Sequence, residues 1–424
     1  MRLFTVFLSL LILAFSCKKK QAFDADYLFT NGSIIKLNEG DVLKRKNILV
    51  KAGKIIDITD SLPNLKIKNI IDLKGKFLLP ALADAHVHLP KNESDLEKFF
   101  ILNLINGVTK LRSMRGDWKH LEWREKYNSK GSIYPKLYLS APPISWRNDF
   151  TTSQLERFVN KAKPFDLIKI LSIKDETLFR RLDSLCKLNN ISIGGHYPQN
   201  ISDNEFFSSN YTSIEHLGGL VEQPELLNYR IKEIKKRNIF LCPTLSWYNV
   251  GSGRYSFEEL RNQPGMQYIS TNVMDDWIEK TKQYRAKMRQ EAYLNEVSVE
   301  LKKLDIKYSI INELHKHGVK MLLSPDSSSK YMISGFGILE EMKLLKKANL
   351  TNLEIIKMAT INFSEFYNGN FGIIERGKDA DFIVLSENPI HNLSVFERVE
   401  GVFINEKFID HDGLNRLSKS ILPK

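Results

Sequence analysis

The chain has 424 residues, which exceeds one ordinary domain, although a single α/β barrel can take most of such a length. A hydrophobic content of 42% and a charged content of 26% are typical of a folded soluble protein and argue against a disordered or fibrous chain. The formal net charge is +12, with lysine spread along the chain, which favours loose attraction to anionic lipid or polymer. The sequence contains no nucleic-acid-binding motif, so we expect no nucleic-acid partner.

The first segment of the chain, MRLFTVFLSLLILAFSCKKK, has the pattern of a targeting signal. One early arginine precedes an apolar run that is too short for a stable membrane span and is typical of a signal peptide. The letters AFSC resemble a relaxed bacterial lipobox, which implies cleavage after residue 16 and lipid on Cys17. We therefore expect a signal peptide over 1–16, a lipid-anchored tether over 17–25 and a place in the bacterial cell envelope, on the periplasmic or surface side. An uncleaved membrane anchor is the alternative.

Two other cysteines, Cys186 and Cys242, are present. Their spacing lacks the regularity of a disulfide framework, so we expect isolated buried thiols, with a disulfide between them as the alternative.

Both ends of the remaining chain predict short β-strands. Residues 26–76 contain β-branched runs such as YLFTNGSIIKL and NILVKAGKIIDI, which are broken by turn residues. Residues 367–424 return to the same pattern with FGIIERGKDADFIVL and RVEGVFINEKFI. We expect the two ends to join into one small composite β-sandwich.

Residues 77–366 alternate between apolar runs and amphipathic stretches, the latter at 153–163, 175–189, 222–237 and 337–348. Eight runs read as strands: FLLPALADAHVHL, VTKLRSM, KLYLSAPPI, DLIKIL, ISIGGHY, TSIEHL, IFLCPTLSWY and VKMLLSPDS. Repeated strand–helix units predict a parallel sheet, and eight of them predict a closed (β/α)8 barrel. Thr351-Asn352-Leu353-Glu354 predicts a capping box. The stretch at about 249–306 is too long for a plain loop, so we expect a helical insertion, either a lid or a peripheral hairpin.

Polar side chains of ligand type fall at the ends of five of these strands. His86 and His88 are two residues apart, so they point to the same face of a strand, and neutral imidazole suits zinc. Because reactive groups of such a barrel gather at the carboxyl ends of its strands, we expect them to meet at one rim. The candidates are His86, His88, Lys169, His196, His216 and Asp326.

This pattern resembles the metal-dependent amidohydrolase superfamily, and within it the imidazolonepropionase- and prolidase-like branch, which also carries a lysine in a D-x-I-K strand. The resemblance covers nearly the whole mature chain and rests on LLPALADAHVHL, NGVTKLRSM, FDLIKI, GGHYP, SIEHL, LLSPDSS and the tail FGIIERGKDADFIVL. Ala81, where the family has glycine, and Tyr197, where a small residue is usual, depart from the pattern. The second departure puts the substrate pocket in doubt.

The resemblance implies two divalent metal ions, for which we expect zinc. It implies that His86, His88 and Asp326 bind one ion and that His196 and His216 bind the other. Lys169 would lie between the ions as a carbamate formed with carbon dioxide. The sequence itself shows only that Lys169 interrupts an apolar strand, where burial would depress its pKa and favour the neutral amine. A lysine that extends to the barrel rim or pairs with an acid is the alternative.

These assignments lead to a hydrolase of C–N bonds in amides, cyclic amides or dipeptides, acting on a small-molecule substrate with Asp326 as the proton shuttle. A lactone or phosphotriester hydrolase on the same site is the enzymatic alternative, and deamination is disfavoured because that branch generally uses one metal. A catalytically silent ligand-binding surface lipoprotein is the alternative from another class.

Four side chains at strand ends are candidates for substrate contact: Arg112, Arg147, Tyr197 and Trp247. An arginine could bind a substrate carboxylate, as a dipeptide would require. Tyr197 could instead pack against the next strand. Glu215 precedes His216, so strand alternation places it on the opposite face, and we expect it to be structural.

Overall fold

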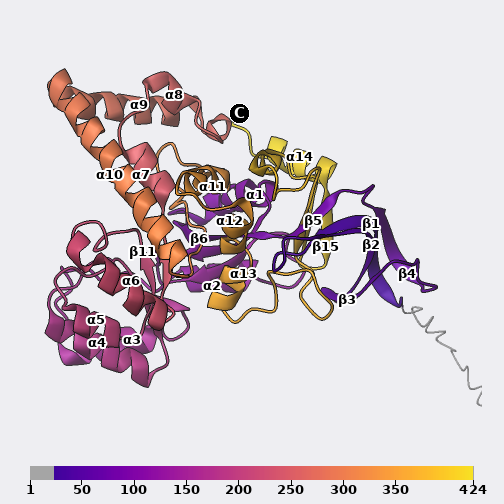
Figure 1. Cartoon of the computed structure of the whole chain (residues 1–424), viewed down its shortest axis with the longest axis horizontal. Coiled ribbons are helices and arrows are strands. Elements are labelled where there is room, and N and C mark those ends of the chain that lie inside the picture. Colours follow the sequence, from indigo (N-terminus) through magenta and orange to yellow (C-terminus); the bar gives the residue numbers. More distant parts are fainter. Residues whose placement is uncertain (1–22, 424) are drawn as a thin grey trace, which may run out of the picture.

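The computed structural model describes residues 23–423 and has a mixed α/β fold (Figure 1). The predicted signal peptide and the lipidation residue Cys17 lie outside the described residues. Within residues 23–423, no helix is both long and apolar enough to cross a bilayer.

Strands from both ends of the chain form one eight-stranded sheet, at the right of Figure 1. Its order is β15-β14-β13-β5-β1-β2-β3, and β4 pairs with β1. The two ends meet where β5 and β13 run antiparallel, with Leu79 opposite Ile383. The described strands belong to a single hydrogen-bonded sheet, and the two facing sheets of a sandwich are not distinguished among them. The strands are β1 (Ala25–Ile35), β2 (Val42–Lys51), β3 (Lys54–Thr59), β4 (Ile67–Asp72), β5 (Phe77–Pro80), β13 (Phe382–Leu385), β14 (Gly401–Ile404) and β15 (Lys407–Asp410).

The middle of the chain forms two parallel sheets, one ordered β6-β7-β8 and the other β12-β11-β10-β9. Isolated bridges such as Ser140–Leu167 link β8 to β9, and the bridge between Leu241 and Met321 links β12 to the eighth predicted strand. The strands are β6 (Leu82–Val87), β7 (Val108–Ser113), β8 (Lys136–Leu139), β9 (Leu167–Ile170), β10 (Ser192–Gly195), β11 (Tyr211–Glu215) and β12 (Phe240–Cys242).

The eighth predicted strand does not form a regular ladder, so the described strands do not make one closed barrel. Its residues reach β12 through the Met321 bridge and β6 through a bridge between Ser327 and Val87. Pro325 has no N–H to donate, and Asp326 has a left-handed φ of 61°, which ends the extended conformation. The expectation of a barrel is thus met only in part.

Amphipathic helices cover the parallel sheets, close to the predicted stretches. The capping box at Thr351 is present, because its side chain accepts from the backbone of Glu354 and the Glu354 side chain accepts in return. Leu155 and Val159 of α3 illustrate the buried faces of these helices. The helices of this part are α1 (Leu96–Ile105), α2 (His120–Tyr127), α3 (Thr152–Ala162), α4 (Glu176–Leu188), α5 (Asp203–Ser208), α6 (Leu227–Lys236), α7 (Leu245–Gly251), α11 (Gly337–Lys347), α12 (Asn352–Met358), α13 (Ile361–Phe366) and, at the composite sheet, α14 (His411–Ser420).

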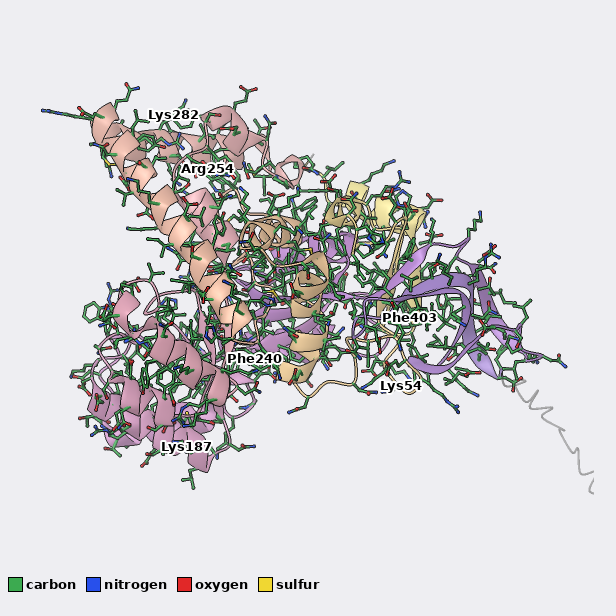
Figure 2. The ribbon with its side chains drawn as sticks, viewed as in Figure 1. Lys54, Lys187, Phe240, Arg254, Lys282 and Phe403 are labelled. Carbon is green, nitrogen blue, oxygen red and sulfur yellow. The ribbon has the colours of Figure 1, made fainter. Side chains whose placement is uncertain are left out.

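The long stretch between β12 and the eighth predicted strand is helical, as expected. It comprises α8 (Phe257–Arg261), α9 (Thr271–Ala286) and α10 (Gln290–Lys316). These helices form an arm that extends from the body at the upper left of Figure 1. Figure 2 labels Lys282 of α9 in this arm and Arg254 in the segment between α7 and α8, closer to the body.

Candidate metal centre

The centre begins at the carboxyl end of β6, where the two histidines of the HVH run approach one carboxylate. His86 is fully buried, and its Nε2 lies 3.5 Å from Oδ1 of Asp326. His88 is partly exposed, and its Nε2 lies 3.3 Å from the same oxygen. One ligand atom from each of these three residues lies within 4.8 Å of the others, which is a spacing that could hold a cation.

Asp84 holds the two segments of this site together. Its carboxylate accepts the backbone N–H of His86 at 3.0 Å and the hydroxyl of Ser327 at 3.1 Å. Asp84 is fully buried, so these contacts satisfy a group that water does not reach. They fix the left-handed turn at Asp326 against the end of β6.

Three further predicted residues complete the cluster. Lys169 lies on β9 with Nζ 3.4 Å from Nε2 of His86. His196 and His216 follow β10 and β11, with ring centroids 4.8 Å apart. Nδ1 of His216 lies 2.7 Å from the hydroxyl of Thr244 and 4.0 Å from Oδ2 of Asp326. The structure thus brings all six predicted ligand residues to one rim.

Burial keeps the imidazoles neutral, which is the form that binds metal ions. It lowers the pKa of His88 and of His196 to about 4 and that of His216 to about 3, with the charge of Lys169 as a further cause. Burial also lowers the pKa of Lys169 to about 8 and raises that of Asp326 to about 6. Neutral nitrogen donors beside a carboxylate fit a divalent cation such as zinc.

Five of the six cluster residues, all but His86, line a cavity of about 820 Å³. Its walls are contributed by the loops that follow the parallel strands and by the start of α7. No lining residue comes from positions 249–306, all of which the structure describes, so the arm does not line the cavity as it stands. The lining includes His88, Arg115, Lys169, Ser172, His196, Tyr197, Gln199, Asn200, Glu215, His216, Trp247, Tyr248 and Asp326.

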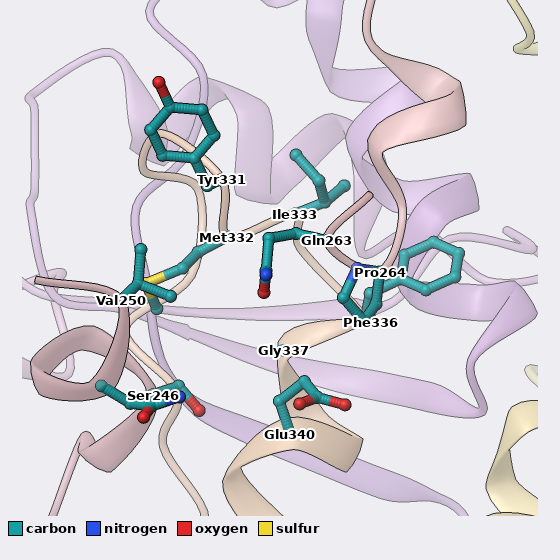
Figure 3. A pocket seen from close by; sticks show the side chains of 11 residues that line it. Ser246, Val250, Gln263, Pro264, Tyr331, Met332, Ile333, Phe336, Gly337 and Glu340 are labelled. Carbon is teal, nitrogen blue, oxygen red and sulfur yellow. The ribbon is translucent and has the colours of Figure 1, made fainter. Parts of the chain in front are cut away.

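A much smaller hollow lies on the other side of α7 (Figure 3). Tyr331, Met332 and Ile333 line it together with Gln263 and Glu340. Its volume of about 20 Å³ has room for about one water molecule, so it is no substrate site.

Two of the four predicted substrate contacts line the large cavity. Trp247 is 44% exposed, with its ring centroid 6.1 Å from that of His216. Tyr197 is buried, its hydroxyl donates to Asp203 and its ring packs against Phe206, both of which belong to α5. Arg112 and Arg147 do not line the cavity. Arg112 is fully buried against Glu215, and exposed Arg147 lies over Trp146 outside the cavity.

The expectation for Glu215 was wrong about its direction. Its Oε2 lies 2.7 Å from Nδ1 of His86, beneath the metal cluster. Alternation fails because His216 has a left-handed φ of 66°, which ends the strand between the two residues and lets both face inward. A buried acid directly before a predicted ligand was the signal that could have identified it.

Cys186 and Cys242 are free and buried, which confirms the expectation of isolated thiols.

Comparison with known proteins agrees with this geometry. Residues 207–409, just under half of the chain, match the family model described as "Amidohydrolase family". The adenine deaminase of Methanocaldococcus jannaschii is 25% identical over 419 residues, which cover 93% of this chain and 62% of the deaminase. The chain thus spans less than two thirds of the length of that relative.

Solved structures show the same fold. A bottromycin amidohydrolase superposes with a TM-score of 0.72 at 20% identity, covering 93% of this chain and 89% of that one. A Xaa-Pro dipeptidase with bound methionine in its active site gives a TM-score of 0.66 at 17% identity, covering 91% and 99%. Residues 207–409 thus match the amidohydrolase family model, and these solved structures share the fold of this chain.

Proposed function

We propose that this chain, which has the fold of the amidohydrolase superfamily and carries a matching domain, is a metal-dependent hydrolase of C–N bonds in amides, cyclic amides or dipeptides. The observation that carries the proposal is the convergence of four imidazoles, Lys169 and Asp326, of which all but His86 line one large cavity. A merely structural core would not require four imidazoles, an amine and a carboxylate to converge beside a cavity.

His86, His88 and Asp326 would hold one ion, and His196 and His216 a second. Lys169 would lie between them after its neutral amine adds carbon dioxide to give a carbamate. When bound, the ions lower the pKa of a water molecule from about 15.7 toward about 7 and polarise the substrate carbonyl.

The position of Asp326 supports a role in proton transfer. Oδ1 faces His86 and His88, and Oδ2 faces His216, so the carboxylate lies between the two halves of the donor set. Burial raises the pKa of Asp326 to about 6, near the range in which a carboxyl can both accept and return a proton at neutral pH. It would accept the proton of the attacking water and deliver it to the leaving nitrogen.

The cavity rim supplies a candidate anchor for a substrate carboxylate. Arg115 lines the cavity close enough to His88 to lower the pKa of that histidine, and it makes no ion pair with any other described residue. A dipeptide or N-acyl amino acid has a carboxylate next to its scissile amide, which a guanidinium binds well. This supports the prolidase-like reading of the site.

The proposal is tested with protein purified in the presence of bicarbonate. We expect about two divalent ions per chain, and hydrolysis of members of a panel of dipeptides, N-acyl amino acids and cyclic ureas. Lys169→Ala should lose metal and activity together. A fully active Lys169→Ala variant would refute the role of the lysine.

A second candidate is deamination, which the adenine deaminase relative favours. The same panel should therefore include adenine, with ammonia release as the readout, and a lactone and a phosphotriester. Turnover of adenine alone would replace amide hydrolysis by deamination. Metal-free protein that turns over no compound would favour a silent binding protein.

We also propose that lipid on Cys17 anchors the protein to the bacterial cell envelope. The Cys17→Ala variant should move from the membrane fraction to the soluble fraction. Unchanged membrane association of that variant would exclude lipidation as the anchor.

A further inference from the structure

A network of buried polar side chains lies directly beneath the metal cluster, and the mechanism above gives no role to Arg112, Ser213 or Glu215 in it. His86, Arg112, Ser213 and Glu215 are each fully buried. Oε1 of Glu215 accepts from Arg112 Nη1 at 2.9 Å and from the hydroxyl of Ser213 at 2.9 Å. Oε2 of Glu215 lies 2.7 Å from Nδ1 of His86. Each carboxylate oxygen therefore has its own partner.

Further contacts hold the Arg112 guanidinium in this network. Arg112 Nη1 donates to the carbonyl of Ala85 at 3.2 Å, and Nη2 lies close to the hydroxyl of Ser213. The ring of Phe366 covers the guanidinium at 5.0 Å. The guanidinium fixes the position of Glu215, because a fork of donors satisfies the carboxylate and the neighbouring carbonyl together.

The two nitrogens of His86 face groups of opposite hydrogen-bonding character. A carboxylate paired with a guanidinium only accepts, so Nδ1 of His86 must carry the hydrogen in this contact. On the other side, Nε2 lies 3.4 Å from the Lys169 amine, which can donate, whereas Oδ1 of Asp326 at 3.5 Å makes no hydrogen bond with it. The Glu215 contact requires the tautomer with hydrogen on Nδ1, and the Lys169 contact is consistent with it, so the lone pair on Nε2 is directed into the donor cluster.

We propose that Glu215, held in place by Arg112 and Ser213, is a positioning residue that fixes the tautomer and ring orientation of His86 for metal binding. This inference rests on the proposed metal centre. A carboxylate behind a ligating histidine typically changes metal affinity by about 10–100-fold when it is removed. The role of Arg112 is one step further away, since it contacts Glu215 and the backbone rather than the imidazole.

The tautomer can be measured without metal or substrate. Protein labelled with 15N on its nine histidines gives one pair of ring nitrogen signals for each ring in a long-range 1H–15N spectrum. A His86→Gln variant identifies the pair that belongs to His86. We expect the Nδ1–H form in metal-free wild-type protein. Finding hydrogen on Nε2 overturns the inference, even when the Glu215 variants fail to fold.

Metal affinity provides the second measurement, by competition for Zn²⁺ with a chromophoric chelator. Glu215→Gln should weaken zinc binding by about 10–100-fold. The matched variant Glu125→Gln, the same change on an exposed carboxyl of α2, should weaken zinc binding by less than about threefold. Equal affinities for wild type and Glu215→Gln overturn the positioning role. Wild-type protein that binds no zinc instead refutes the proposed metal centre, so the two failures are distinct.

Discussion

Two regions of the site differ in how their charged side chains are paired. We call the largely buried cluster of His86, His88, Arg112, Glu215 and Asp326 the floor, and the exposed residues Arg115 and Trp247 the rim. On the floor, each charged group has a buried partner: Glu215 pairs with Arg112, and Asp326 lies between the imidazoles of His86 and His88. On the rim, Arg115 and Trp247 are exposed and line the opening. The charged groups of the floor are therefore held by buried partners, whereas Arg115 on the rim makes no ion pair with another described residue.

From this difference we expect the floor to determine the chemistry and the rim to determine substrate specificity. Buried charges that lose a partner incur a large penalty, so the floor tolerates little change. Exposed side chains at the rim carry no such penalty, and they can be exchanged with little effect on folding. Substitutions on the floor should thus affect stability, metal content or turnover strongly, and those on the rim should affect KM for particular substrates.

The largest effect is expected for Asp326→Asn on the floor. The amide keeps an oxygen that can face the histidines but cannot accept a proton as the carboxylate does, so kcat should fall by about 10²–10⁴-fold. Metal content, measured by atomic emission, should fall far less than kcat. Asp117→Asn, the same change on an exposed carboxyl, is the control. Equal losses of metal and of kcat would show that Asp326 acts as a metal ligand and not as the proton shuttle.

Arg112→Met should destabilise the fold by about 3–5 kcal/mol, because Glu215 would remain as a buried charge without its guanidinium. Denaturant unfolding measures this change. Arg147→Met, the same substitution on an exposed arginine, should change the free energy of unfolding by less than about 0.5 kcal/mol. The double variant Arg112→Met with Glu215→Gln should recover much of the loss. Additive losses in the double variant would contradict the pairing.

The same contrast explains what the sequence could predict. Ligand residues at strand ends and the helix positions followed from periodicity and from the known tendency of barrel sites to gather at one rim. His216 and Asp326 have left-handed backbone conformations, which no local sequence pattern predicted. The turn at His216 determines where Glu215 points, and the turn at Asp326 determines where the eighth predicted strand stops forming ladder hydrogen bonds. Arg112 was expected at the rim because a lone arginine in a strand does not reveal its buried partner, which lies 103 positions away.

Glu341 connects the body to the rim. It is fully buried on α11 and accepts the N–H groups of Leu245 and Ser246 at 2.8 and 2.7 Å, which fixes the start of α7. The following residues of α7, Trp247 and Tyr248, line the cavity. Loss of this carboxylate should therefore loosen one wall of the rim and leave the floor intact.

The pH dependence of Glu341→Gln tests this link. Burial raises the pKa of Glu341 from 4.5 to about 7, so the folded state holds a proton that the unfolded state releases between these values. The contribution of the protonated carboxyl to wild-type stability is complete below about pH 4.5 and is lost as pH rises to about 7. Relative to wild type, Glu341→Gln should gain about 3 kcal/mol across this window, as measured by unfolding at several pH values. A stability difference that does not vary with pH would show that Glu341 does not titrate there.

The smallest effect is expected for Arg115→Ala on the rim. Loss of one charge-assisted contact at an exposed site should raise KM about tenfold for substrates that carry a carboxylate beside the scissile amide. KM for the corresponding carboxamide substrates should be unchanged, and so should metal content and the free energy of unfolding. Arg147→Ala, which removes an exposed arginine outside the cavity, is the matched control. If Arg115→Ala raised KM equally for both substrate classes, the guanidinium would contribute to the shape of the opening but would not bind the substrate carboxylate. The rim would then select substrates by fit rather than by charge.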